Sequence, residues 1–115
     1  MNQPTFFLLA IGCILIHEMD AVRCKEWRIF PGLHLLTDRW GEALFMLLHV
    51  PLFYYLFYYL FMPETQAGMR AGLNYFFMIH VGLHLLLLLH PKNEFKDGWS
   101  WALIIGAGFF SMLDL

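Results

Sequence analysis

The sequence predicts an all-α fold, an integral membrane four-helix bundle, and three observations lead to it. The 115-residue chain is 60% hydrophobic and only 14% charged, whereas an average globular chain carries about 25% charged residues. Its mean hydropathy is +0.60. Its apolar residues gather in four runs, separated by short segments that contain Pro. Because no linker or repeat divides the chain, residues 1–115 are expected to form one domain.

The first two helices are predicted over residues 4–24 and 40–62. The purely apolar part of the first helix is shorter than the roughly 20 residues that cross a hydrocarbon core. This helix must therefore carry His17, Glu18 and Asp20 into the membrane or to its inner edge. The second helix is a long apolar and aromatic run that stops before a proline.

The third and fourth helices are predicted over residues 66–90 and 98–114. Pro91 ends the third helix, because the residue before a proline is disfavoured in the helical conformation. The fourth apolar run is short for a full crossing. Four crossings would place the connecting segments 25–39 and 91–97 on the same side of the membrane.

Basic residues divide unevenly between the two sides of this predicted bundle. Only Arg70 lies on the side of the chain ends. The other side holds Arg23, Lys25, Arg28, Arg39, Lys92 and Lys96. Since short cytoplasmic loops carry an excess of Lys and Arg, both termini are expected on the non-cytoplasmic side. The net charge of −2 gives no basic field, so nucleic acid is not an expected partner.

Four histidines are expected at a similar depth in the membrane. Counting about 1.5 Å per residue from the outer edge places their rings roughly 18 to 27 Å deep, on three helices. His17 and Asp20 are three residues apart and His80 and His84 are four apart, so each pair shares a helix face. Ionisable side chains in hydrocarbon are costly and mark a functional site by default. The four histidines are His17, His49, His80 and His84.

Imidazole and carboxylate groups together suit Zn or Fe. The four histidines and Asp20 are therefore candidate metal ligands, and Glu18 and Asp20 are candidate acid–base groups. Glu18 points about 100° away from the preceding histidine, so both cannot aim ideally at one centre. Arg23 and Arg28, near the predicted cytoplasmic interface, are candidates for binding an anionic headgroup. A purely structural role in hydrogen bonding between helices is the competing explanation for each polar residue.

The leading functional hypothesis is a membrane metalloenzyme that hydrolyses or oxidises an apolar or lipid substrate. One alternative is haem b held by His49 with His80 or His84 for electron transfer. Another is a non-enzymatic, proton-coupled small transporter or accessory subunit that relays protons through His17, Glu18 and Asp20. The expected partners are membrane lipid and a lipid-like substrate, with assembly into a homo-oligomer left open.

Residues 17–21 (HEMDA), 26–28 (EWR) and 31–32 (PG) carry a family resemblance. They are similar to small bacterial four-helix membrane proteins of unknown function, which resemble in turn the family named for its HXXEE motif. Asp20 and Ala21 stand where that motif has two glutamates. The resemblance implies a protein of the bacterial inner (cytoplasmic) membrane and brings no known reaction.

Overall fold

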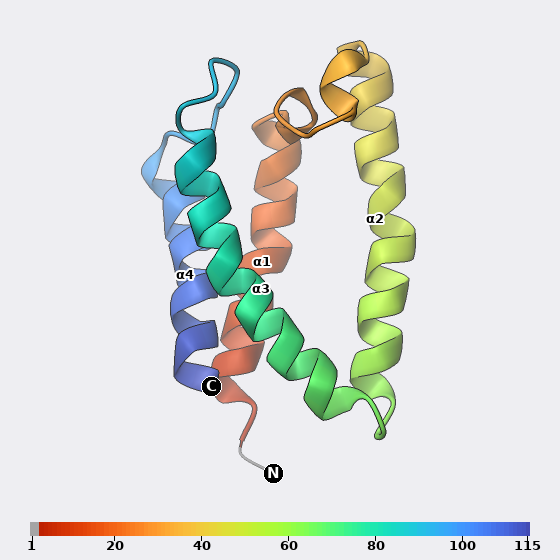
Figure 1. Cartoon of the computed structure of the whole chain (residues 1–115), viewed down its shortest axis with the longest axis vertical. Helices are drawn as coiled ribbons and strands as arrows, with labels where there is room; N and C mark the ends of the chain where they lie inside the picture. Colours follow the sequence, from red (N-terminus) through yellow and green to blue (C-terminus); the bar gives the residue numbers. More distant parts are fainter. Residues whose placement is uncertain (1–2) are drawn as a thin grey trace.

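The computed structural model describes residues 3–115, and in that part of the chain all regular structure is helical, which confirms the all-α prediction (Figure 1). Two short 3₁₀ helices, η1 and η2, lie in the connection that follows the first helix. The long helices are α1 (Thr5–Arg23), α2 (Asp38–Phe61), α3 (Gln66–Leu87) and α4 (Gly98–Asp114), and the short ones are η1 (Glu26–Arg28) and η2 (Leu33–Leu35).

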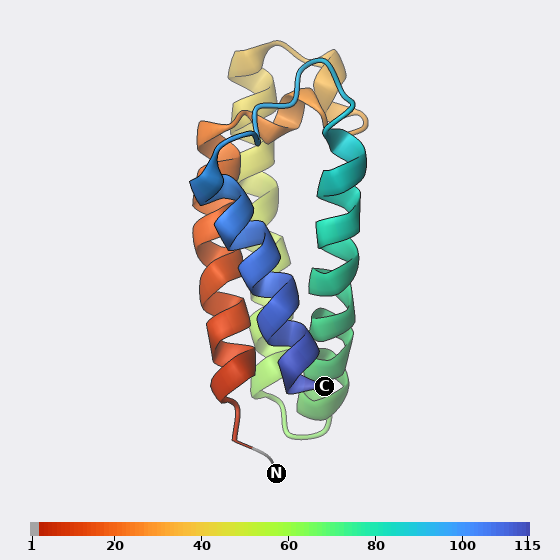
Figure 2. The same cartoon turned by 90° about the vertical axis from the view of Figure 1, so that its left-hand side faces the viewer.

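Helix α4 is the centre of the packing. It makes the most extensive contact with α1 and the next most extensive with α3, so the last helix joins the first and third (Figures 1 and 2). Helix α2 stands apart from these three and is connected to them mainly through α3 and η1. The fold is therefore a compact three-helix unit with a fourth helix beside it.

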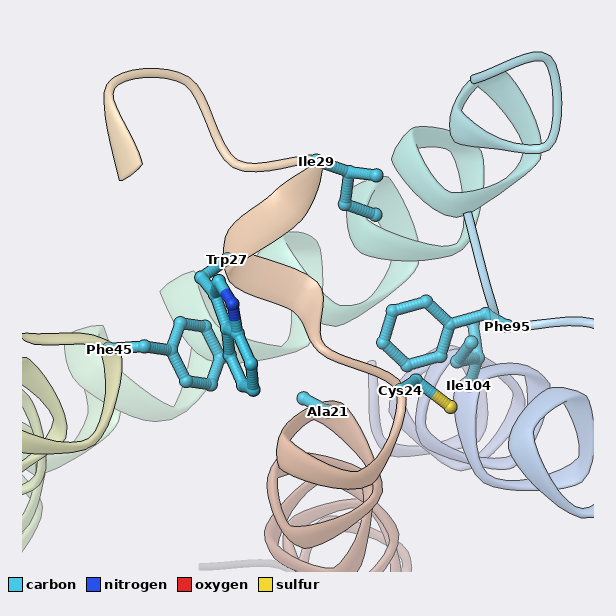
Figure 3. Close-up of a cluster of buried hydrophobic side chains, with 7 residues drawn as sticks. All are labelled: Ala21, Cys24, Trp27, Ile29, Phe45, Phe95 and Ile104. Carbon is cyan, nitrogen blue, oxygen red and sulfur yellow. The ribbon is translucent and has the colours of Figure 1, made fainter. Parts of the chain in front are cut away.

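Two clusters of buried apolar side chains hold the helices together. The first lies at the end of the molecule where α1 leads into η1, and Figure 3 shows Trp27 of η1 beside Phe45 of α2. Their ring centroids are 6.1 Å apart. The second cluster lies between α1, α3 and α4 nearer the chain ends, and consists of Phe7, Ala10, Ile14, Leu73, Phe77 and Ala107. Burying a large apolar side chain contributes about 1.5–3 kcal/mol.

Helices α1 and α2 are long and apolar enough to cross a membrane. Only 6% of the apolar span of α2 is buried, and all of its tyrosine and most of its leucine side chains are exposed. A helix that contacts lipid along its length needs apolar side chains on its outer surface. Four crossings, and the side on which the termini lie, stay predictions.

A buried ion pair fastens the beginning of α3 to the end of α4. The Nε of Arg70 donates to Asp114 at 2.7 Å, its Nη2 donates to the other carboxylate oxygen, and Asn74 Nδ2 also donates at 2.7 Å. The side chain of Asp114 is only 3% exposed. The carboxylate therefore depends on these donors for its charge to be tolerated.

Arg70→Met removes the cation and leaves the Asp114 carboxylate buried without its partner. We expect the free energy of unfolding to fall by about 3–5 kcal/mol. Arg70→Met/Asp114→Leu should recover most of this loss, because no charge then stays buried. Denaturant unfolding of the detergent-solubilised protein measures both, and a double variant no more stable than the single one would contradict the explanation.

Close approach of α4 to α3 requires a glycine. A Cβ at Gly108 would lie 2.6 Å from Cγ2 of Val81 and 3.5 Å from the carbonyl oxygen of Phe77. We expect Gly108→Ala to lower the free energy of unfolding by about 1–3 kcal/mol through overpacking. Gly82→Ala is the matched control, since no atom outside its chain neighbours and its own helix backbone lies within 4 Å of its Cβ position. Equal unfolding midpoints for the two variants would contradict this assignment.

Candidate metal centre

Three of the four predicted histidines come together in the interior. His17 lies on α1 with no exposed surface, and His80 and His84 lie one turn apart on α3, also buried. The ring centroid of His17 is 4.7 Å from that of His80 and 5.0 Å from that of His84. The Nε2 atoms of His80 and His84 are 3.1 Å apart. One ring nitrogen from each residue falls in a group within 4.8 Å, which could hold a metal ion.

The direction of the helices explains why these rings meet. Helices α1 and α3 run the same way from the same end of the molecule (Figure 2). From the bounds of the two helices, His17 is residue 13 of α1 and His80 is residue 15 of α3. At 1.5 Å per residue, the two positions reach nearly the same level. The spacing of four residues then puts His84 on the same face as His80.

The hydrogen-bond state of the cluster is unusual for buried imidazoles. Both ring nitrogens of His17, and Nδ1 of His80 and of His84, have no hydrogen-bond partner among residues 3–115. Phe95 covers the cluster, with its ring centroid 4.7 Å from that of His84 and 5.5 Å from that of His17. Each buried polar group without a partner costs about 1–3 kcal/mol. A cation bound by the three rings would offset part of this cost.

The fourth histidine, His49, lies outside this group. Its Nδ1 is 2.6 Å from the carbonyl oxygen of Phe45 and must donate to it, because a carbonyl only accepts. Its Nε2 is 2.5 Å from Oε2 of Glu18. The expectation that His49 joins the other histidines is thus not met in this geometry. The reason is that α2 stands apart from α1 and α3, and Glu18, one residue past His17, turns towards α2.

Asp20 also has other partners than the histidines. Its carboxylate accepts from Arg23 Nε at 2.7 Å and from Ser100 Oγ at 2.5 Å. Arg23 donates in addition to Asp97 at 2.8 Å, and these four residues form what we term the α1–α4 network. Asp20 was an expected metal ligand and Arg23 an expected headgroup ligand. Both side chains have their hydrogen-bond partners within this network instead.

Asp97 links the α1–α4 network to the start of α4. Its Oδ1 accepts from the backbone N–H of Ser100 at 2.8 Å, which makes it the N-cap of the helix. Hydrogen bonds from this N–H and from Arg23 lower the pKa of Asp97 to about 2. The cap is therefore ionised at neutral pH and favoured by the positive end of the helix dipole.

Arg28, the other expected headgroup ligand, is held by an acid. Its Nε and Nη2 donate to the two carboxylate oxygens of Asp38 at 2.9 Å and 2.5 Å. Trp27 Nε1 donates to the same carboxylate at 3.0 Å. This bidentate pair fixes η1 onto the beginning of α2, so Arg28 has a structural partner in the protein itself.

Two residues near the site had no assigned role in the sequence analysis. Phe95 covers the histidines. The only feature of the sequence that could have indicated this is that Phe95 is the one aromatic residue in the polar segment 91–97. Glu26 begins η1. Burial, and the nearby carboxylate of Glu18, raise the pKa of Glu26 to about 8.

The fold and this cluster define an all-helical protein with a buried three-histidine group. The chain belongs to DUF6713, a family of unknown function, whose family model matches residues 3–115. The comparisons show this family and not the HXXEE-motif family. No curated protein and no solved structure matches the chain.

The raised pKa of Glu26 predicts a pH-dependent stability. Between its ordinary pKa of 4.5 and its folded value of about 8, the folded state binds more protons than the unfolded state, so stability falls as pH rises. Glu26→Gln stays neutral, so its melting temperature should fall less between pH 5 and pH 9 than that of the wild type. Circular dichroism measures this, with exposed Glu64→Gln as a control that keeps the wild-type slope. A wild-type slope in Glu26→Gln would refute the effect.

Proposed function

We propose that this chain is an integral membrane protein that binds one transition-metal ion through His17, His80 and His84 and uses it in a reaction on an apolar or lipid substrate. The observation that carries the proposal is the group of three buried imidazoles, contributed by two helices, with ligand atoms within 4.8 Å of one another. The unpartnered ring nitrogens support it, because a structural histidine is normally hydrogen-bonded when buried.

Zinc is the ion that this ligand set favours. Catalytic zinc sites have three protein ligands, in some enzymes three histidines, and keep one position open for water or substrate. Non-haem iron sites use two histidines and a carboxylate, and Asp20 is bonded to Arg23 and Ser100 instead. Haem b held by His49 with His80 or His84 is not supported, because the two ring nitrogens of His49 contact the carbonyl oxygen of Phe45 and the carboxylate of Glu18 instead.

The membrane part of the proposal rests on composition and charge. Helices α1 and α2 have the length and hydropathy of membrane spans, and most of α2 is apolar surface without protein cover. The basic residues near the two connections at one end favour a cytoplasmic location for that end. We place the protein in the bacterial inner membrane with both termini outside.

An apolar pocket supports a substrate with a hydrocarbon tail. The pocket has a volume of about 800 Å³ and lies between α1, α2 and α3 towards the chain ends, with Phe7, Ile11 and Phe57 in its wall. Ile11 on α1 and Asn74 on α3 line it, and each is six residues before a histidine of the cluster, about 9 Å along the helix. This volume is typical of sites for small apolar ligands.

The proposed chemistry is hydrolysis of an ester or amide bond. Zinc, when bound, supplies a water whose pKa is lowered to about 7. Glu18 and His49 are the proposed acid–base pair, since Nε2 of His49 lies 2.5 Å from Oε2 of Glu18 and Glu18 follows the ligand His17 directly in the chain. Asp20 is proposed as a positioning residue that orients α1 on α4.

The Glu18–His49 pair also favours a second candidate function, a proton relay in a small transporter or accessory subunit. A carboxylate and an imidazole at hydrogen-bond distance can pass a proton between α1 and α2 without any metal. This function needs pH-dependent flux in proteoliposomes and no stoichiometric metal.

Elemental analysis of the detergent-purified protein tests the metal site. We expect about one zinc per chain in the wild type, and below about a tenth in His17→Ala, His80→Ala and His84→Ala, since each removes one of three ligands. His49→Ala and Asp20→Asn are matched controls that should keep the metal, because their side chains have other partners.

Removal of the metal from the wild type with a chelator should lower the melting temperature, because a ligand bound only to the folded state stabilises it. Well-folded wild-type protein without stoichiometric metal, even after incubation with zinc, would contradict the proposal. So would equal metal content in the His80→Ala and His49→Ala variants.

A further inference from the structure

The three histidines lie near the end of the molecule opposite the chain termini. His84 is three residues before the last residue of α3, a rise of about 4.5 Å along the helix. His80 is 14 residues after the first residue of α3, which corresponds to about 21 Å. The cluster is therefore much closer to the end that carries the connections between α1 and α2 and between α3 and α4, and both connections lie at that end in Figures 1 and 2.

The longer route, from the chain ends, is filled with apolar side chains. Ile14 lies about one turn before His17 on α1, Phe77 lies about one turn before His80 on α3, and both are buried. They belong to the second apolar cluster described above. Crossing this layer would strip a cation of its water without offering ligands, and so would crossing the lipid around the proposed membrane bundle. A metal ion is therefore not expected to arrive from the chain ends or from the sides.

On the shorter route, one aromatic ring stands between the histidines and a polar pocket. Glu94 and Lys96 line this pocket, which has a volume of about 480 Å³. Phe95 lies between them in the chain and has no exposed surface, because its ring faces inward and contacts His84 and His17. The wall between the pocket and the cluster is thus the segment 94–96 with the ring of Phe95 beneath it.

The segment that carries Phe95 is held in place by few hydrogen bonds. Residues 91–97 form no regular helix. Trp101 Nε1 donates to the carbonyl oxygen of Phe95 at 2.7 Å, and the N–H of Phe95 donates to Asn93 Oδ1 at 3.3 Å. The ring itself makes only aromatic contacts with the histidines. Such a segment opens at lower cost than a helix, whose backbone hydrogen bonds break cooperatively.

We infer that Phe95 is a gate through which a metal ion reaches the three histidines, from the end of the molecule opposite the chain termini. This inference rests on the proposed metal site. It gives the ion and the substrate separate ways in, since the apolar pocket proposed for a hydrocarbon tail lies towards the chain ends. In the proposed topology, the ion comes from the cytoplasm.

Release of zinc from the zinc-loaded, detergent-purified protein to excess chelator tests the gate. We expect Phe95→Ala to release zinc about tenfold faster than the wild type or more, because the two ring contacts that close the path are lost. Its zinc content before the chelator is added should equal that of the wild type, since all three ligands are kept. Phe77→Ala is the matched control and should release zinc at the wild-type rate, because it truncates a similarly buried phenylalanine on the other side of the histidines.

A second variant loosens the gate without removing the ring. Trp101→Phe keeps an aromatic side chain but loses the hydrogen bond to the carbonyl oxygen of Phe95. It should also release zinc faster than the wild type, by a smaller factor than Phe95→Ala. The test therefore does not depend on the folding of the Phe95 variant.

Exchange of the imidazole Cε1–H for deuterium follows the same path with water as the probe. In chelator-treated protein in D₂O, analysed by mass spectrometry, His84 and His17 should exchange faster in Phe95→Ala than in the wild type and in Phe77→Ala. Equal rates in Phe95→Ala and the wild type, or equal acceleration in Phe77→Ala, would overturn the gate. Wild-type protein that takes up no zinc contradicts the metal site itself, whereas zinc-loaded variants with equal release rates contradict only the gate.

Discussion

The burial of three imidazoles between α1 and α3 is the constraint on which the rest of this structure depends. Four of their ring nitrogens have no hydrogen-bond partner in the described chain, and each such group costs about 1–3 kcal/mol. Whole domains are stable by only about 5–15 kcal/mol. The surrounding packing, with α4 against both helices and Phe95 over the rings, therefore has to hold the cluster together.

The short segment 17–20 of α1 determines three helix interfaces. Successive residues in a helix point about 100° apart, so polar side chains close in sequence reach different neighbours. His17 faces α3, Glu18 pairs with His49 on α2, and Asp20 bonds with Ser100 on α4. The same rotation separates the proposed metal ligand from the proposed acid–base pair. A residue inserted into this segment would redirect all the side chains that follow it.

Helix number and approximate bounds followed from the sequence because apolar runs and prolines mark them. The third helix ends at Leu87 instead of residue 90, since the last residues before Pro91 form tighter turns. Counting residues along each helix predicted that His17 and His80 lie at a similar depth, because their helices start at the same end of the molecule. It could not show that α2 stands apart, which separates His49. Nor does any spacing rule connect Asp20 with Ser100, 80 residues later.

The pairing of the first helix with the last has a consequence for biosynthesis. Chains emerge from the ribosome N-terminus first, so α1 and α3 are complete before Phe95 and α4 have been made. During that interval the imidazole rings lack their cover and are open to the surroundings. The interior of this protein is therefore closed only after the chain has been synthesised as far as α4.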